Sequence, residues 1–95
     1  MLNMVGFFKM TKGFLEKFGE DRVRNTPLCD SAIVGAALGL SLKNKKAIIE
    51  MHVSDFVTVG FNEIVNNLAK LHYRWGQNAD VVIRMPTGAG VGAGP

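Results

Sequence analysis

Two residues with acid/base side chains stand close behind short strand-like runs of this chain. Asp30 follows residues 22–27 and opens a stretch of small apolar residues, and His52 follows residues 47–51, with Asp55 close behind it. The imidazole of His52 and the carboxylate of Asp55 could act as an acid/base pair. Asp30 and His52 each also have a structural interpretation, because an aspartate at a helix start commonly caps the first amides and a single histidine is more often a hydrogen-bonded structural group. On these residues alone, both interpretations stay open.

Other kinds of site have little support in the sequence. Cys29 is the single cysteine and is expected to be a small buried hydrophobe, as free cysteines commonly are. His52 and His72 are twenty residues apart with no cysteine pair to join them, which excludes a zinc-type ligand set. Residues 87–95 are rich in glycine, but no phosphate-loop lysine follows, so we interpret them as a flexible loop or a cut end. The predicted ligand site is therefore near Asp30 and His52.

The elements that must position these residues alternate along the chain. A short β-like run predicts a strand at residues 22–27, and apolar runs predict strands at 47–51 and 81–85, of which the strand at 47–51 is expected to be covered on both faces. A stretch of small apolar residues predicts a buried helix over 30–42, and a periodic stretch predicts a helix over 61–75. The pattern predicts an α/β fold, a parallel βαβαβ unit, with ligands beyond the carboxyl ends of its strands. A further helix with Phe7, Met10, Phe14 and Phe18 on one face is expected before it, ending at Gly19, and Gly76 is expected to end the helix over 61–75. The apolar stripe of that last helix is expected to consist of Phe61, Ile64, Val65, Leu68 and Leu71.

Length and composition limit the chain to one small domain. It has 95 residues, of which 47% are hydrophobic and 20% charged, and a mean hydropathy of +0.15. A chain of this length with so apolar a composition is expected to bury further surface against a partner or against missing sequence.

Gly35 and Gly39 are expected to allow close backbone approach at the helix over 30–42. The net charge is +3, but Lys43, Lys45 and Lys46 form the only basic cluster, a weak indication of nucleic-acid binding.

Three blocks of the sequence closely resemble the β subunit of thiamine-diphosphate-dependent 2-oxo acid dehydrogenases of the branched-chain, pyruvate or acetoin type. These blocks are Asn-Thr-Pro-Leu-Cys-Asp-Ser-Ala-Ile-Val-Gly at 25–35, Ile-Glu-Met-His-Val-Ser-Asp-Phe at 49–56 and Phe-Asn-Glu-Ile-Val-Asn-Asn-Leu-Ala-Lys at 61–70. The resemblance runs from about residue 8 to residue 89. It implies a transketolase-like pyrimidine-binding domain, of which residues 1–95 would be a single partial domain, about half, with a glycine-rich loop or cut end at 87–95.

The same resemblance implies site residues and a cofactor. Asp30 stands where the family has a catalytic glutamate, whose carboxyl group hydrogen-bonds N1′ of the aminopyrimidine of thiamine diphosphate. Leu28, Asp30, His52 and Phe56 are expected to contact the cofactor, with histidine at 52 where relatives often have glutamine. Mg²⁺ is expected to bind mainly to the partner α subunit. Aspartate is one methylene shorter than glutamate, about 1.5 Å, which places full activity in question.

The resemblance also implies a reaction and partners. The source protein would be an oxidoreductase that decarboxylates a 2-oxo acid and passes the acyl group to a lipoyl acyltransferase, acting with an α subunit or a fused α region as an oligomer. The isolated chain is expected to be inactive, without nucleic-acid or membrane partners, and to reside in the cytoplasm or, in a eukaryote, the mitochondrial matrix. The alternative is a non-catalytic fragment or degenerate paralogue that serves as an interaction module.

Overall fold

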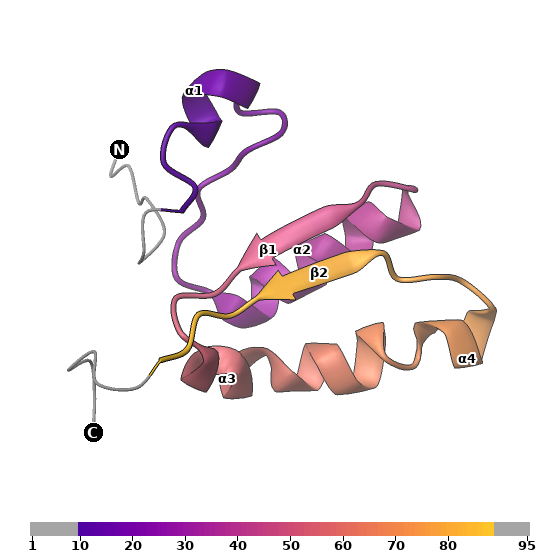
Figure 1. Cartoon of the computed structure of the whole chain (residues 1–95). Coiled ribbons are helices and arrows are strands. Elements are labelled where there is room, and N and C mark those ends of the chain that lie inside the picture. Colours follow the sequence, from indigo (N-terminus) through magenta and orange to yellow (C-terminus); the bar gives the residue numbers. More distant parts are fainter. Residues whose placement is uncertain (1–9, 89–95) are drawn as a thin grey trace.

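A computed structural model of the chain describes residues 10–88 (Figure 1). Its elements are helix α1 (Phe14–Phe18), helix α2 (Asp30–Leu42), strand β1 (Ala47–Glu50), 3-10 helix η1 (Ser54–Phe56), helix α3 (Val57–Asn62), π-helix η2 (Glu63–Leu68), helix α4 (Leu71–Trp75) and strand β2 (Val81–Arg84). The helical segments between β1 and β2 form one crossover connection, which is what parallel strands require.

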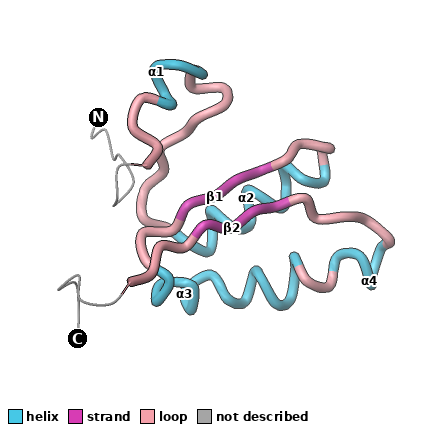
Figure 2. Tube along the Cα trace, viewed as in Figure 1, coloured by secondary structure: helices cyan, strands magenta, loops and turns pink. Residues whose placement is uncertain are grey.

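The two strands form a parallel pair in which Ala47 lies opposite Val81 and Glu50 lies opposite Arg84. Figure 2 shows them side by side along their whole length. Helix α2 packs against both strands, and α3 and η2 pack against α2 in turn. The predicted α/β class and the βαβ connection between the last two strands are therefore confirmed.

The first predicted strand, residues 22–27, is wrong. These residues form no regular secondary structure, and the sheet of the described residues has two strands. The amides of Arg22 and Val23 instead donate to the carbonyl of Gly19, at 3.2 and 2.9 Å, and Pro27 has no amide to donate. The segment is exposed apart from the half-buried Val23, and among residues 10–88 no strand pairs with it, so the run is coil.

Glycines end two helices as predicted, and a third glycine shortens the first helix. Gly19 and Gly76 close α1 and α4 with φ of 77° and 67°. Gly13 also has a positive φ, 83°, directly before α1. Because a left-handed residue interrupts a right-handed helix, α1 is a five-residue helix rather than a long one; the predicted contribution of Phe7 lies outside the described residues.

The helix predicted over 61–75 starts earlier and buries a different line of residues. Helical structure begins at Ser54, and Gly60 and Leu71 are buried with Ile64 half-buried between them. Phe61 and Val65, predicted to face the core, are 53% and 36% exposed. The turn at η2 is wider than an α-turn, as the Ala69 amide donates to the Ile64 carbonyl five residues back at 2.9 Å.

The predicted close approach at Gly35 and Gly39 is also wrong, because it occurs at Gly60. A Cβ at Gly60 would lie 3.2 Å from Cγ2 of Val34 and 3.4 Å from the backbone oxygen of Asp30. At Gly35 and Gly39 a Cβ would meet nothing within 4 Å. The glycine that allows two helices to approach is therefore on α3, and it fixes the beginning of α2.

The core of the described residues is small and covers one face of the sheet. Val34, Ala37, Ala47, Met51 and Leu71 are its buried apolar side chains. On the other face, the register partners Ile48 and Val82 are 75% and 57% exposed. The prediction that residues 47–51 are covered on both faces is wrong for this part of the chain, because α2 is the layer that packs on the strands. Within residues 10–88, no helix is both long enough and apolar enough to cross a membrane.

Ser41 provides a polar link that the sequence pattern did not reveal. It is 6% exposed near the end of α2. Its hydroxyl accepts a hydrogen bond from the Asp80 amide at 2.7 Å and donates one to the Asn78 carbonyl at 3.3 Å. The hydroxyl therefore joins α2 to the segment that leads into β2.

Replacing Ser41 by alanine should lower the free energy of unfolding by about 1–3 kcal/mol, because it leaves a part-buried amide and carbonyl unpaired. Urea denaturation measures the change. The matched control is Thr58→Ala, which removes an exposed hydroxyl that donates to the Asp55 carbonyl at 3.2 Å and that water can replace. Equal losses for the two variants would contradict the role assigned to Ser41.

Candidate functional site

The segments that carry the predicted site residues lie at the carboxyl ends of β1 and β2. Helix α2 runs opposite to β1, which follows it in the chain, so the beginning of α2 lies at this edge of the sheet. The segment after β1 leads directly into η1 and α3 at the same edge (Figure 1). The fold therefore brings residues 28–30 and 52–56 to one end of the molecule, as the parallel-sheet prediction required.

Asp30 is the first residue of α2 and is 8% exposed. The cap position belongs to Cys29, and no side chain there bonds a helix amide, so the capping interpretation of Asp30 is not supported. Within residues 10–88, no hydrogen bond or ion pair to the Asp30 carboxylate is formed. A carboxylate in the first turn of a helix gains from the helix dipole, but burying it costs free energy. Asp30 is therefore a buried carboxylate within the first turn of α2 rather than its cap.

The two residues before Asp30 are on the surface. Leu28 is 65% exposed, and Cys29 is exposed as well. The prediction that Cys29 is a buried hydrophobe is wrong, because the chain turns into α2 only at Asp30 and the cysteine lies outside the packed face. Leu28 and Cys29 therefore present an apolar, accessible margin beside a buried carboxylate.

His52 and Phe56 lie on the segment that follows β1. His52 is half-buried in a bend, and Phe56 is the last residue of η1 with 45% of its surface exposed. The Ser54 amide between them donates to the Pro86 carbonyl at 3.0 Å. Asp55, the other predicted acid/base residue, is exposed, and its backbone carbonyl accepts the Thr58 hydroxyl.

An ion pair that the sequence pattern did not reveal lies behind this segment. Nη2 of Arg84 is 2.8 Å from Oε2 of Glu50, and the two side chains are 35% and 20% exposed. Glu50 Oε1 and Arg84 Nη2 are buried and make no directed hydrogen bond within the described residues, so the contact is a close charge pair. Glu50 and Arg84 are each the fourth residue of a predicted strand, and their opposite charges at this shared position were the signal in the sequence that could have predicted the pair.

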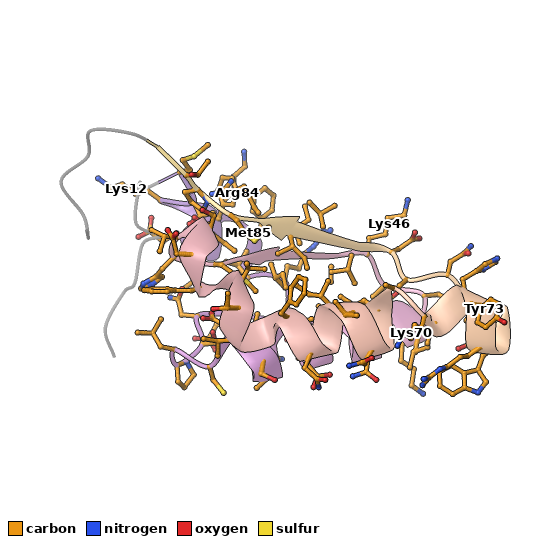
Figure 3. The ribbon with its side chains drawn as sticks, turned by 90° about the horizontal axis from the view of Figure 1, so that it is seen from below. Lys12, Lys46, Lys70, Tyr73, Arg84 and Met85 are labelled. Carbon is orange, nitrogen blue, oxygen red and sulfur yellow. The ribbon has the colours of Figure 1, made fainter. Side chains whose placement is uncertain are left out.

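The opposite end of the sheet has a different character. A polar hollow of about 310 Å³ is lined there by Ser41, Leu42, Asn44, Lys46, Gln77, Asn78 and Asp80. Lys46 and Tyr73 mark this end in Figure 3, whereas Arg84 and Met85 mark the end with the predicted site. None of the predicted site residues lines the hollow.

The residues gathered at the carboxyl edge suit a flat nitrogen heterocycle. A carboxyl group can hydrogen-bond a ring nitrogen, an imidazole can donate or accept, and an exposed aromatic ring can stack. Among residues 10–88, no group of three His, Cys, Asp or Glu side chains is placed to hold a metal ion. The fold is that of an α/β domain, with the predicted site residues at the carboxyl edge of its sheet.

Comparison with known proteins gives the family. The sequence model described as transketolase, pyrimidine binding domain, matches residues 4–95. The chain belongs to this family, and the resemblance found in its sequence is confirmed.

The curated relatives are β subunits. The chain is 41% identical over 88 residues to the 2-oxoisovalerate dehydrogenase subunit beta of Bacillus subtilis, covering 90% of this chain and 27% of that protein. It is 42% identical over 87 residues to the mitochondrial 2-oxoisovalerate dehydrogenase subunit beta 2 of Arabidopsis thaliana, covering 88% of this chain and 24% of that protein. It is 41% identical over 91 residues to the mitochondrial pyruvate dehydrogenase E1 component subunit beta of Saccharomyces cerevisiae, covering 94% of this chain and 25% of that protein. The chain thus spans about a quarter of the length of these relatives.

Proposed function

We propose that this chain is part of the β subunit of a thiamine-diphosphate-dependent 2-oxo acid dehydrogenase, in which it forms part of the pyrimidine-binding domain. The observation that carries the proposal is the buried Asp30, which lies at the carboxyl edge of a parallel sheet and caps no helix. The family and the β-subunit relatives support it. Glycine-rich residues 87–95 would be a loop of the same domain.

The residues present fit the pyrimidine part of the cofactor. Asp30 would hold a proton at N1′ of the aminopyrimidine, a role that a carboxyl group suits because its oxygens can hydrogen-bond a ring nitrogen. Phe56 would stack on the ring, His52 would hydrogen-bond its polar edge, and Leu28 would exclude water. When bound, thiamine diphosphate supplies the electron sink for decarboxylation.

The remaining parts of the reaction would come from partners. An α subunit or fused α region would hold the diphosphate and its Mg²⁺, and a lipoyl acyltransferase would receive the acyl group derived from the 2-oxo acid. The assembly would be an oligomer in the cytoplasm or the mitochondrial matrix; the yeast and Arabidopsis relatives are named as mitochondrial.

A binding and turnover experiment tests the proposal. The full-length subunit that contains these residues, combined with its α partner and Mg²⁺, should bind thiamine diphosphate in calorimetric titration and release carbon dioxide from a branched-chain 2-oxo acid or pyruvate. The 95-residue chain alone should do neither, because it carries only the pyrimidine side of a shared site. Absence of both binding and turnover in the complete assembly would overturn the proposal.

The alternative is a non-catalytic interaction module, and the aspartate at position 30 favours it. The shorter side chain would place the carboxyl group about 1.5 Å away, and a misplacement of this size can lower a rate about 100-fold. An assembly that forms with the α partner and binds the cofactor but does not release carbon dioxide, even with Asp30→Glu, would identify this alternative.

A further inference from the structure

We propose that Glu50 and Arg84 form a positioning pair that fixes the segment carrying His52 and Phe56; the inference rests on the proposed function of those two residues. Glu50 and Arg84 are register partners at the carboxyl ends of β1 and β2. Their side chains lie on the sheet face opposite α2, because side chains alternate along a strand and Ala47 is buried while Ile48 is exposed. The pair therefore joins the strands at the last position before the site.

The backbone continues the same connection beyond the strands. The Met51 amide donates to the Arg84 carbonyl, and the Ser54 amide donates to the Pro86 carbonyl, both at 3.0 Å. The Phe56 amide then donates to the Val53 carbonyl at 3.2 Å, which begins η1. His52 lies between the donors of the first two bonds, and Phe56 is the donor of the third. Any separation of the two strand ends would shift His52 and Phe56 relative to Asp30, whose backbone packs against Gly60 farther along α3.

Because the Glu50–Arg84 pair is partly buried, we expect the removal of one charge to have a large effect that is confined to the ends of the two strands. With 35% and 20% of their side chains exposed, the two charges are partly shielded from solvent. Removing one leaves the other buried without its partner, which costs more than removing both. The expected consequence is opening of the strand ends rather than unfolding of α2, whose buried residues Val34 and Ala37 lie on another layer.

The test uses the full-length subunit with its α partner and the variants Arg84→Met and Glu50→Arg/Arg84→Glu, with Lys46→Met as the matched control at the other end of β1. In Arg84→Met we expect hydrogen exchange of the Met51 and Ser54 amides to rise about tenfold while Val34 and Ala37 change less than about twofold. The Michaelis constant for thiamine diphosphate should rise about tenfold, with kcat at saturation changed less than about twofold. The charge-exchanged variant should recover most of both effects, and Lys46→Met should show neither.

Two results would overturn the inference. In the first, the hydrogen-exchange rates of the Met51 and Ser54 amides in Arg84→Met stay unchanged or rise by the same factor as those of Val34 and Ala37 in α2. The pair would then not fix the segment after β1 in particular. The other is local loosening with an unchanged Michaelis constant, because the segment would then not position the cofactor contacts. If the unmodified assembly binds no thiamine diphosphate, the proposed function fails, and the exchange measurement alone still decides whether the pair fixes this segment.

Discussion

Replacing Asp30 by asparagine should lower the kcat for 2-oxo acid decarboxylation by about 100- to 10,000-fold, the range expected when a positioned acid/base group is lost. The amide has nearly the shape of the carboxyl group but cannot hold the proton at N1′ of the aminopyrimidine. Because Asp30 caps no helix amide, the substitution should leave α2 intact. Steady-state release of carbon dioxide by the full-length subunit with its α partner measures the loss.

Two companion variants make this result specific. Asp30→Glu adds the methylene of the glutamate that the resemblance implies at this position and should raise kcat, by up to about 100-fold if the displacement of the carboxyl group limits the rate. Asp80→Asn makes the same chemical change at an exposed residue at the other end of the sheet and should leave kcat unchanged. If Asp30→Asn retained full activity, Asp30 would not be the catalytic carboxylate.

The second large effect concerns the contact between α2 and α3. Gly60→Leu should lower the free energy of unfolding by about 3 kcal/mol, because overpacking a tight contact costs about 1–3 kcal/mol and here one of the opposing atoms belongs to the backbone. The new Cβ would lie 3.2 Å from Val34 Cγ2 and 3.4 Å from the Asp30 oxygen. The Val34 side chain can rotate, but the Asp30 backbone moves only if the beginning of α2 moves. Urea denaturation of the 95-residue chain measures the loss.

The matched control for Gly60→Leu is Gly39→Leu, in the middle of α2. Nothing lies within 4 Å of a Cβ at Gly39, so this substitution should raise the free energy of unfolding by up to about 1 kcal/mol through helix propensity alone. A loss at position 39 as large as that at position 60 would show that the two helices do not meet as described. Activity of Gly60→Leu should also fall, because the residue holds the segment that carries Asp30.

Several elements could be predicted from the sequence because neighbouring residues decide them. The bounds of α2 agree with the predicted range 30–42, since a run of small apolar residues between Asp30 and the lysines at 43–46 favours a helix by itself. Gly19 and Gly76 end helices because their positive φ is a local property of glycine. The site residues Leu28, Asp30, His52 and Phe56 were predicted from motif resemblance, and their assignment stays a prediction.

Other features depend on which segments meet in space, and the tertiary structure alone decided them. Residues 22–27 were predicted to be a strand, but a strand exists only where a neighbour accepts its hydrogen bonds, and here the amides of Arg22 and Val23 bond to Gly19 instead. The close helix contact occurs at Gly60 rather than Gly35 or Gly39, because it depends on which helices pack together. The pairing of Glu50 with Arg84 required the strand register. The sequence of this protein by itself therefore determined where helices end and which family motifs the chain carries. The pairing of the strands, the contact between α2 and α3 and the burial of Asp30 arose from interactions between residues far apart in the chain.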